Sequence, residues 1–186
     1  MSTQLFFGTP IYYTKTDIIE DLTELESHAV YSAEYHQDND IQSSTFLSNH
    51  NVVEYHPRVE QKIVQIAKDY VATLNTDIDT SRMKIMNSWF NNYPDGGFVG
   101  WHNHNYVHNT ISMVYYIDIE DGPIHFKSPN PFSSGFPCSN TNEMTNSEVI
   151  LEPKPMDLLM FPSWLMHKTA INSKGKRKIF SANLQF

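Results

Sequence analysis

The sequence predicts one mainly β domain, in which two helices support an antiparallel sandwich or barrel. After about Arg82, six short strand-like runs follow one another, separated by Gly, Pro, Asn and Asp: MKIMNSWFNNY, TISMVYYIDI, GPIHFKSP, EVILEPK, DLLMFPSW and KIFSANLQF. No helical stretch lies between these runs, and such a succession is typical of antiparallel sandwiches and barrels. Before Arg82, two stretches have helical periodicity instead.

The first 80 residues supply the supporting elements. The opening QLFFGTPIYYTKT predicts one or two short strands, and Asp17 to about Tyr31 predicts a helix. Residues 36–51 are polar and predict a loop. Residues 56–75 give the clearest helix, with Pro57 in the first helical position and apolar residues at three- and four-residue steps. We therefore expect a single domain over 1–186, with an N-terminal strand and supporting helices in 1–80 and the β core in 81–186.

Composition argues against several classes of protein. A net charge of −8 argues against general nucleic-acid binding. The single cysteine, Cys138, excludes an intramolecular disulfide framework and a cysteine-built zinc site. There is no apolar run of the ~20 residues needed to cross a bilayer, and the N-terminus lacks a signal-peptide pattern. We expect a cytoplasmic protein that does not associate with a membrane.

Three histidines lie within WHNHNYVH, residues 101–108. In an extended strand, the spacing of His102 and His104 points both imidazoles to one face. A non-haem ferrous site needs three ligands on one face, usually two histidines and a carboxylate, with open positions opposite. His167 follows the apolar DLLMFP run and is a candidate third ligand. Arg177, ten residues later, has the planar fork that pairs with a carboxylate. A hydrogen-bonded histidine pair on a strand is the competing interpretation.

The order of these motifs resembles a known family, the iron- and 2-oxoglutarate-dependent oxygenases of the prolyl-hydroxylase-like type. SWFNNYPDGGFVGWHNH is similar to the family's Tyr-Pro and Gly turn before the first metal histidine, and TISMVYYIDIEDGPIHF is similar to its central strand pair. The stretch from ILEPKPMDLLMF to the C-terminus resembles its distal histidine and co-substrate arginine. The similarity is greatest to a branch of small oxygenases found in marine bacteria and phages.

The resemblance implies a double-stranded β-helix, a cupin-like jelly roll, backed by two N-terminal helices. It implies that His102 and His167 bind Fe(II) and that Arg177 pairs with the 5-carboxylate of 2-oxoglutarate. Tyr116 is expected to hydrogen-bond the same carboxylate, and Tyr93 is a further candidate for that pocket. O2 is the other co-substrate, and ascorbate is the expected reductant.

His104 departs from the family pattern, because the family has a carboxylate ligand two residues after the first histidine. We expect His104 to complete a three-histidine face; the alternative has His104 outside the ligand set and Asp95 or a water in its place. Three imidazoles leave the metal complex more cationic, which favours the dianionic co-substrate. They also weaken selection for iron over nickel, copper or zinc, which imidazole binds well.

Further residues are assigned more loosely. His108 is expected to be a polar loop residue near the substrate entrance, and a further metal ligand is the competing interpretation. Trp164 is a candidate for the same entrance, with a packing residue as the competing interpretation. Asn183 follows Arg177 by six residues, so in a strand both side chains point to the same face, and Asn183 is a candidate to face the pocket. His125 is expected to be a hydrogen-bonded sheet residue. The segment from about Pro129 to Ser147, rich in Ser, Asn, Pro and Gly, is expected to form a loop near the open end of the barrel.

The predicted function is oxidative decarboxylation of 2-oxoglutarate coupled to hydroxylation of an unidentified substrate, either a protein side chain or a small molecule. Two alternatives compete with it: a non-catalytic metal-binding β-helix module, and a three-histidine cupin-like dioxygenase that does not use 2-oxoglutarate. The position of Arg177 distinguishes them, because only the first function needs a buried cation beside the metal pocket.

Overall fold

The computed structural model describes residues 8–34, 42–105, 110–129, 147–173 and 175–186. Within these ranges the chain forms ten strands and two helices, which are, in order, β1 Tyr12–Lys15, α1 Ile19–Glu26, β2 Ser32–Glu34, β3 Gln42–Ser44, α2 Pro57–Thr73, β4 Lys84–Tyr93, β5 Ile111–Ile119, β6 Ile124–Lys127, β7 Glu148–Leu151, β8 Asp157–Pro162, β9 His167–Thr169 and β10 Arg177–Gln185. All six strand-like runs predicted after Arg82 contain a strand.

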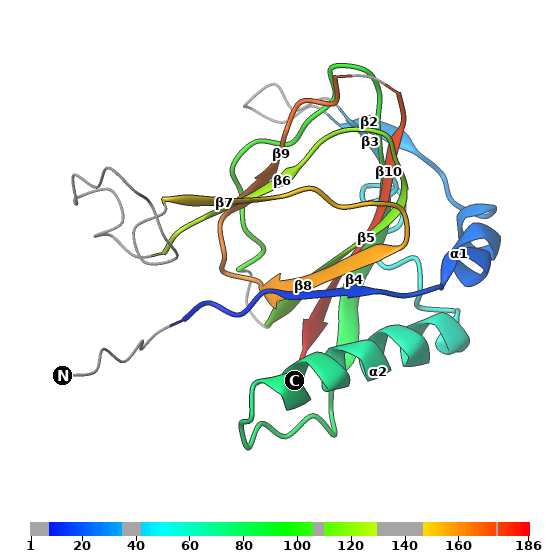
Figure 1. Ribbon diagram of the computed structural model, residues 1–186. Coiled ribbons are helices and arrows are strands. Elements are labelled where there is room, and N and C mark those ends of the chain that lie inside the picture. Colours follow the sequence, from blue (N-terminus) through cyan, green and yellow to red (C-terminus); the bar gives the residue numbers. More distant parts are fainter. Residues whose placement is uncertain (1–7, 35–41, 106–109, 130–146, 174) are drawn as a thin grey trace.

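The strands form two sheets. The major sheet has the order β1-β8-β5-β10-β4-β3-β2, and the minor sheet has the order β7-β6-β9. Each pairing between these strands is antiparallel. Figure 1 shows the minor sheet on one side of the major sheet and α2 on the other. The architecture is therefore the mainly β, two-sheet arrangement expected of a jelly roll.

The longer helix, α2, begins and ends at residues suited to those positions. Pro57 stands at the start, where its missing N–H costs no hydrogen bond. Asn75, just beyond the C-cap, has the positive φ of 52° that commonly terminates a helix. The buried face consists of Val59, Ile63, Ala67, Tyr70 and Val71. This stripe has the three- and four-residue spacing of an amphipathic helix, and it holds α2 against the sheet.

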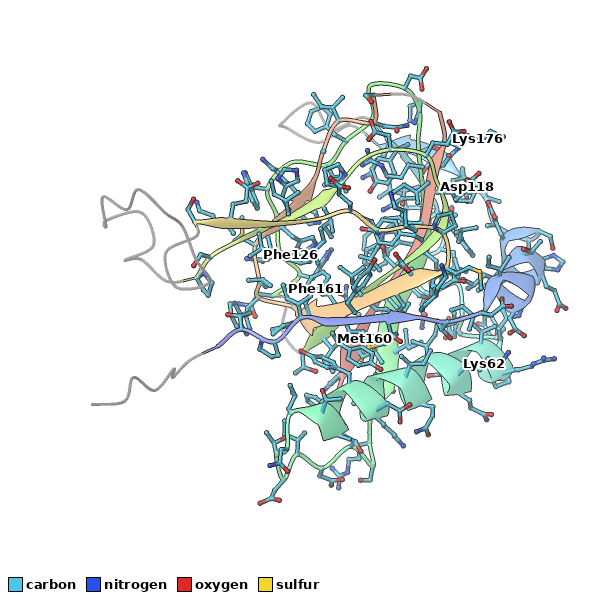
Figure 2. The ribbon with its side chains drawn as sticks, in the orientation of Figure 1. Lys62, Asp118, Phe126, Met160, Phe161 and Lys176 are labelled. Atoms are coloured by element: carbon cyan, nitrogen blue, oxygen red, sulfur yellow. The ribbon has the colours of Figure 1, made fainter. Side chains whose placement is uncertain are left out.

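Two hydrophobic clusters lie on opposite faces of the major sheet. One joins Leu22 of α1 and Ile63 of α2 to Phe90 and Phe180 of the central strands. The other lies between the sheets and includes Phe126 of β6 and Phe161 of β8, whose ring centroids are 4.9 Å apart. Figure 2 shows these two phenylalanines between the sheets and Met160 on the side of α2. Because neighbouring strand residues point to opposite faces, β8 contributes to both clusters.

The structure corrects two boundaries predicted from the sequence. The first helix covers only Ile19–Glu26, because the chain turns after Ser27 and continues as β2. Residues 36–51 were expected to be a loop, yet Gln42–Ser44 form β3, which pairs with β4 through Ser43–Asn92 and Ser44–Asn91. A polar three-residue strand has little hydrophobic pattern of its own, and β3 forms here because the side of β4 that β10 does not pair with offers hydrogen bonds. Neither helix in the described ranges combines the length and apolarity needed to span a membrane.

Candidate metal centre and its cavity

Backbone hydrogen bonds bring His102 and His167 together. The two residues form an isolated antiparallel bridge, in which each backbone N–H donates to the carbonyl of the other at 2.9 Å. The backbone N–H of His104 donates to the carbonyl of Ser163 at 2.8 Å. The segment that carries WHNH is therefore held against the segment around His167, next to the minor sheet. This pairing fixes the relative position of three side chains that are far apart in sequence.

The three imidazoles converge. One ring nitrogen from each of His102, His104 and His167 lies within 4.8 Å of the others. The ring centroids are 4.2 Å apart for His102 and His167, 5.0 Å for His102 and His104, and 5.2 Å for His104 and His167. Among the described residues, this is the only group of three or more His, Cys, Asp or Glu that could hold a metal ion. Asp95, the alternative third ligand, is exposed and does not belong to it.

Two of the rings are oriented by backbone carbonyls. Nδ1 of His102 lies 2.8 Å from the carbonyl oxygen of Gly100, and Nδ1 of His167 lies 2.9 Å from that of Leu165. Since a carbonyl oxygen only accepts, each Nδ1 carries the proton and each Nε2 keeps its lone pair. A hydrogen bond from the second ring nitrogen is the usual way in which proteins orient a metal-binding histidine. Phe161 packs edge-on against His167 at 4.8 Å and restricts its ring further.

Burial disfavours the protonated form of two of the imidazoles, those of His104 and His167. It lowers the pKa of His104 to about 3, and the nearby His102 lowers it further in the same direction. Burial, followed by the charges of His102 and His104, also lowers the pKa of His167 well below its usual value. Neutral imidazole is the form that binds metals, and it suits Fe, Zn, Ni and Cu. The chemistry of the three donors therefore fits a divalent transition metal.

The three histidines line a cavity of about 320 Å³ on the face of the major sheet away from the helices. Its wall along β4 consists of the alternate side chains Asn87, Trp89, Asn91 and Tyr93. Tyr116 of β5 also lines it. The cavity thus runs along the strands, with Tyr93 at one end of the β4 wall and Asn87 at the other.

Arg177 lies next to the Tyr93 end. Its side chain is 1% exposed, and its Cζ is 5.2 Å from the centroid of the Tyr93 ring. Nη1 donates to the carbonyl of Ala170 at 2.9 Å and Nε donates to that of Asp121 at 3.4 Å. Among the described residues, Nη2 has no hydrogen-bond partner. A buried cation with an unsatisfied donor is costly, so this end of the cavity favours an anion.

Two tyrosines and a glycine complete the surroundings of Arg177. Burial raises the pKa of Tyr116, with a further rise from Tyr93 and an opposing effect from Arg177, so the phenol stays protonated and able to donate. Gly122 has a φ of +117°, and a Cβ there would lie 1.9 Å from Nη2 of Arg177. Gly122 is therefore required both by its backbone conformation and by the close approach of the guanidinium.

The structure places three of the other residues singled out from the sequence, and one lies outside the described residues. Asn183 lines the cavity, as its strand parity suggested. Trp164 is 45% exposed and is not among the cavity-lining residues, and its place at the substrate entrance stays a prediction. His125 hydrogen-bonds Glu148 across the minor sheet, as a sheet residue was expected to do. His108 lies outside the described residues, as does most of the predicted loop from Pro129 to Ser147.

Sequence reasoning missed Trp89 and Asn87, which share the cavity wall with Tyr93. The sequence did contain a signal for both residues. In a strand, the side chains of residues 87, 89, 91 and 93 point to the same face, and Tyr93 was already a candidate for the pocket. Trp89 lies 5.6 Å from His104 between ring centroids. It is therefore in direct contact with the histidine cluster.

A family model described as "Putative 2OG-Fe(II) oxygenase" matches residues 87–183, more than half of the chain. This range includes all three histidines, both tyrosines and Arg177. The chain belongs to the 2OG-Fe(II) oxygenase family. It is a non-haem iron enzyme that depends on 2-oxoglutarate, and ferrous iron, 2-oxoglutarate and O2 are the cofactor and co-substrates of the family.

Solved structures of 2OG-Fe(II) oxygenases share the fold. A *Pseudomonas putida* prolyl-4-hydroxylase matches with a TM-score of 0.65 and 10% identity, over 95% of this chain and 92% of that one. A *Burkholderia pseudomallei* oxidoreductase of the 2OG-Fe(II) oxygenase family matches with a TM-score of 0.64 and 10% identity, over 94% and 85%. HygX from *Streptomyces hygroscopicus*, with nickel, 2-oxoglutarate and hygromycin B bound, has a TM-score of 0.62 and 11% identity, over 95% and 83%. No curated protein matches the chain in sequence.

Proposed function

We propose that this oxygenase holds Fe(II) through Nε2 of His102, His104 and His167, and that it hydroxylates a C–H bond of its substrate. The observation that carries the proposal is the convergence of one ring nitrogen from each of these three histidines in the cavity. The backbone carbonyls of Gly100 and Leu165 support it, because they leave the Nε2 lone pairs of two rings available. His104 takes the position of the family's carboxylate ligand.

Arg177 is proposed to bind the 5-carboxylate of 2-oxoglutarate. Its buried guanidinium has a donor, Nη2, that lacks a partner among the described residues, and a carboxylate would satisfy it. The protonated hydroxyl of Tyr116 would donate to the same carboxylate. Tyr93 would hold the guanidinium in place through its ring.

When bound, iron with 2-oxoglutarate and O2 supplies the oxidising chemistry that yields succinate, CO2 and a hydroxylated substrate. The residues of the chain position the reactants. The three histidines would hold the metal, and Arg177 with Tyr116 would fix the far end of the co-substrate. Phe161 and the apolar residues between the sheets limit the access of water to the histidines.

We also propose that residues 1–186 act as one catalytic domain, with residues 1–80 backing a jelly-roll core formed by residues 81–186. Supporting this, Leu22 of α1 and Ile63 of α2 belong to the same hydrophobic cluster as Phe90 and Phe180 of the central strands. The helices would thereby hold the major sheet in the shape that the cavity needs.

The test is succinate formation from 2-oxoglutarate, measured with added ferrous iron and ascorbate for the wild type and for His167→Ala. We expect the wild type to form succinate slowly even without its substrate and the variant to lose this activity. Isothermal titration of 2-oxoglutarate onto the zinc-loaded protein provides a second readout. A wild type that neither forms succinate nor binds 2-oxoglutarate would instead be a metal-binding module.

A further inference from the structure

A row of polar side chains crosses three neighbouring strands at the end of the cavity wall opposite Tyr93. In the register of the sheet, Asn183 of β10 pairs with Asn87 of β4 on one side and with Ser112 of β5 on the other. All three side chains line the cavity. Asn183 and Ser112 are each 2% exposed. We call Asn87, Asn183 and Ser112 the polar row.

Hydrogen bonds give the polar row a direction. Oγ of Ser112 lies 3.0 Å from Oγ of Ser163 and 2.7 Å from Oδ1 of Asn183. Since Oδ1 only accepts, the Ser112 hydroxyl donates to it and accepts from Ser163. Nδ2 of Asn183 then donates to Oδ1 of Asn87 at 2.6 Å.

Asn87 is the last residue in this chain of hydrogen bonds. Its Oδ1 is occupied by Asn183, so its Nδ2 is the group at the free end of the row. That nitrogen makes no hydrogen bond with any other described residue. The row therefore ends in N–H donors on a side chain that lines the cavity, and a ligand there must accept hydrogen bonds.

The polar row lies on the His104 side of the cavity and far from Arg177. The carbonyl of Ser163 accepts from the backbone N–H of His104 at 2.8 Å. Trp89, two residues from Asn87 on the same strand face, contacts the His104 ring. Arg177 lies six residues along β10 from Asn183, about 20 Å at ~3.3 Å per residue. A five-carbon co-substrate anchored at Arg177 does not reach the row, so that part of the cavity is left for the other substrate.

The absence of charged side chains among the described cavity-lining residues favours an uncharged substrate group. The cavity-lining residues of the described part of the chain include no Asp, Glu, Lys or Arg. They offer amides, hydroxyls and aromatic rings, and Phe46 packs edge-on against Trp89 at 5.1 Å beside the row. A charged group placed at the polar row would lose its hydration without gaining a side chain of opposite charge. An uncharged carbonyl would gain hydrogen bonds at no such cost.

We propose that the polar row is the substrate-binding subsite, and that Asn87 Nδ2 donates to an uncharged carbonyl of the substrate, such as a carboxamide, while the apolar part of that group packs on Trp89. This inference rests on the proposed function only in treating the ligand as the molecule to be oxidised. Asn183 and Ser112 are positioning residues, which act by fixing the orientation of the Asn87 amide.

Three small glycine derivatives that differ in charge test the charge preference. They are N-acetylglycinamide, which is neutral, N-acetylglycinate, which is anionic, and glycinamide, which is cationic. Each is titrated onto zinc-loaded protein, with and without 2-oxoglutarate, and the indole N–H signal of Trp89 is followed by NMR after assignment with Trp89→Phe. We expect the neutral probe to bind about tenfold more tightly than either ion, since the subsite has no charged side chain to pair with an ion.

Asn183→Asp tests the direction of the row. An aspartate there accepts from both Ser112 and Asn87, so the Asn87 amide turns and its Oδ1 faces the cavity beside a new negative charge. We expect the preference to change to the cationic glycinamide. Asn87→Asp, at a less buried position, should produce the same change if Asn183→Asp does not fold. Asn92→Asp is the matched control, because it adds the same charge to the exposed face of β4.

The outcomes separate the two proposals. Equal binding of the three probes to the wild type, or an unchanged preference in both aspartate variants, overturns the substrate subsite. A change of preference in Asn92→Asp as well would show a general effect of charge and would also overturn it. The 2-oxoglutarate affinity of the same wild-type sample is measured separately, and its absence overturns the proposed function while leaving the result for the polar row intact.

Discussion

His102 and His167 hydrogen-bond to each other through both backbone N–H groups at 2.9 Å, and their imidazole centroids lie 4.2 Å apart. The backbone bridge thus sets the distance between two side chains from separate segments. His104 follows two residues after His102, and a second long-range hydrogen bond, from its backbone N–H to the carbonyl of Ser163 at 2.8 Å, brings its ring to the other two. Backbone hydrogen bonds between separate segments therefore assemble the proposed metal site.

Removing His167 should abolish metal binding. A metal that binds only the folded protein stabilises it by about 2.7 kcal/mol at a concentration 100 times its Kd, and we expect Ni(II) to raise the Tm of the wild type accordingly. His167→Ala should show no such rise in Tm, because the two imidazoles that remain do not make up the three-ligand site. His125→Ala is the control on the same sheet, because His125 binds Glu148 instead of the cluster. An unchanged nickel response in His167→Ala would exclude the three-histidine site.

Replacing His104 by aspartate should change which metal is preferred. Carboxylate oxygen is a harder ligand than imidazole and suits Mn(II), whereas imidazole suits Zn(II). We therefore expect the ratio of Zn(II) to Mn(II) affinity to fall in His104→Asp, measured by competition with a chromophoric chelator. If the ratio stays the same while both metals still bind, His104 is not a ligand.

Arg177→Gln should weaken 2-oxoglutarate binding. The loss of a charge-assisted hydrogen bond costs about 1.5–3 kcal/mol, which corresponds to a roughly 10- to 100-fold higher Kd. Isothermal titration with the zinc-loaded protein measures this. Lys178→Gln is the neighbouring control, since Lys178 pairs with Glu26 on the other face of the sheet. Equal affinities in the two variants would argue against Arg177 as the anchor.

Gly122→Ala should impair co-substrate binding without altering Arg177 itself. The new Cβ would lie 1.9 Å from Nη2, so the guanidinium must move. Gly96→Ala controls for backbone strain, because Gly96 also has a positive φ but a Cβ there meets no atom within 4 Å. We expect the 2-oxoglutarate Kd to rise in Gly122→Ala by at least as much as a lost hydrogen bond costs, about 3- to 10-fold, and to stay near the wild-type value in Gly96→Ala. Nickel binding should survive in both variants.

Ile63→Ala should destabilise the fold. Ile63 is fully buried between α2 and the major sheet, and such a truncation costs about 2–5 kcal/mol. Gln61→Ala, on the exposed face of the same helix, should change the free energy of unfolding by less than about 0.5 kcal/mol. Urea unfolding followed by circular dichroism measures both. Similar losses in the two variants would mean that α2 does not hold the sheet through this face.

Much of the fold follows from local pattern. The six runs after Arg82 alternate or are continuously apolar between turn residues, and each contains a strand. The buried face of α2 can likewise be predicted from the three- and four-residue spacing of its apolar residues. In contrast, β3 has no hydrophobic pattern, and it exists because β4 offers hydrogen bonds that only the folded chain presents. Helix α1 is shorter than its apolar stripe, because the next strand begins at Ser32.

The sequence by itself determined which residues are the candidates for the chemistry, because His102, His104, His167 and Arg177 stand in the order and spacing of a known family. Only the tertiary structure decided how they meet. The bridge between His102 and His167 and the burial of Arg177 against Tyr93 depend on contacts between distant segments, which no local pattern encodes. The polar row has the same origin: Asn87, Ser112 and Asn183 become neighbours only through the register of three antiparallel strands.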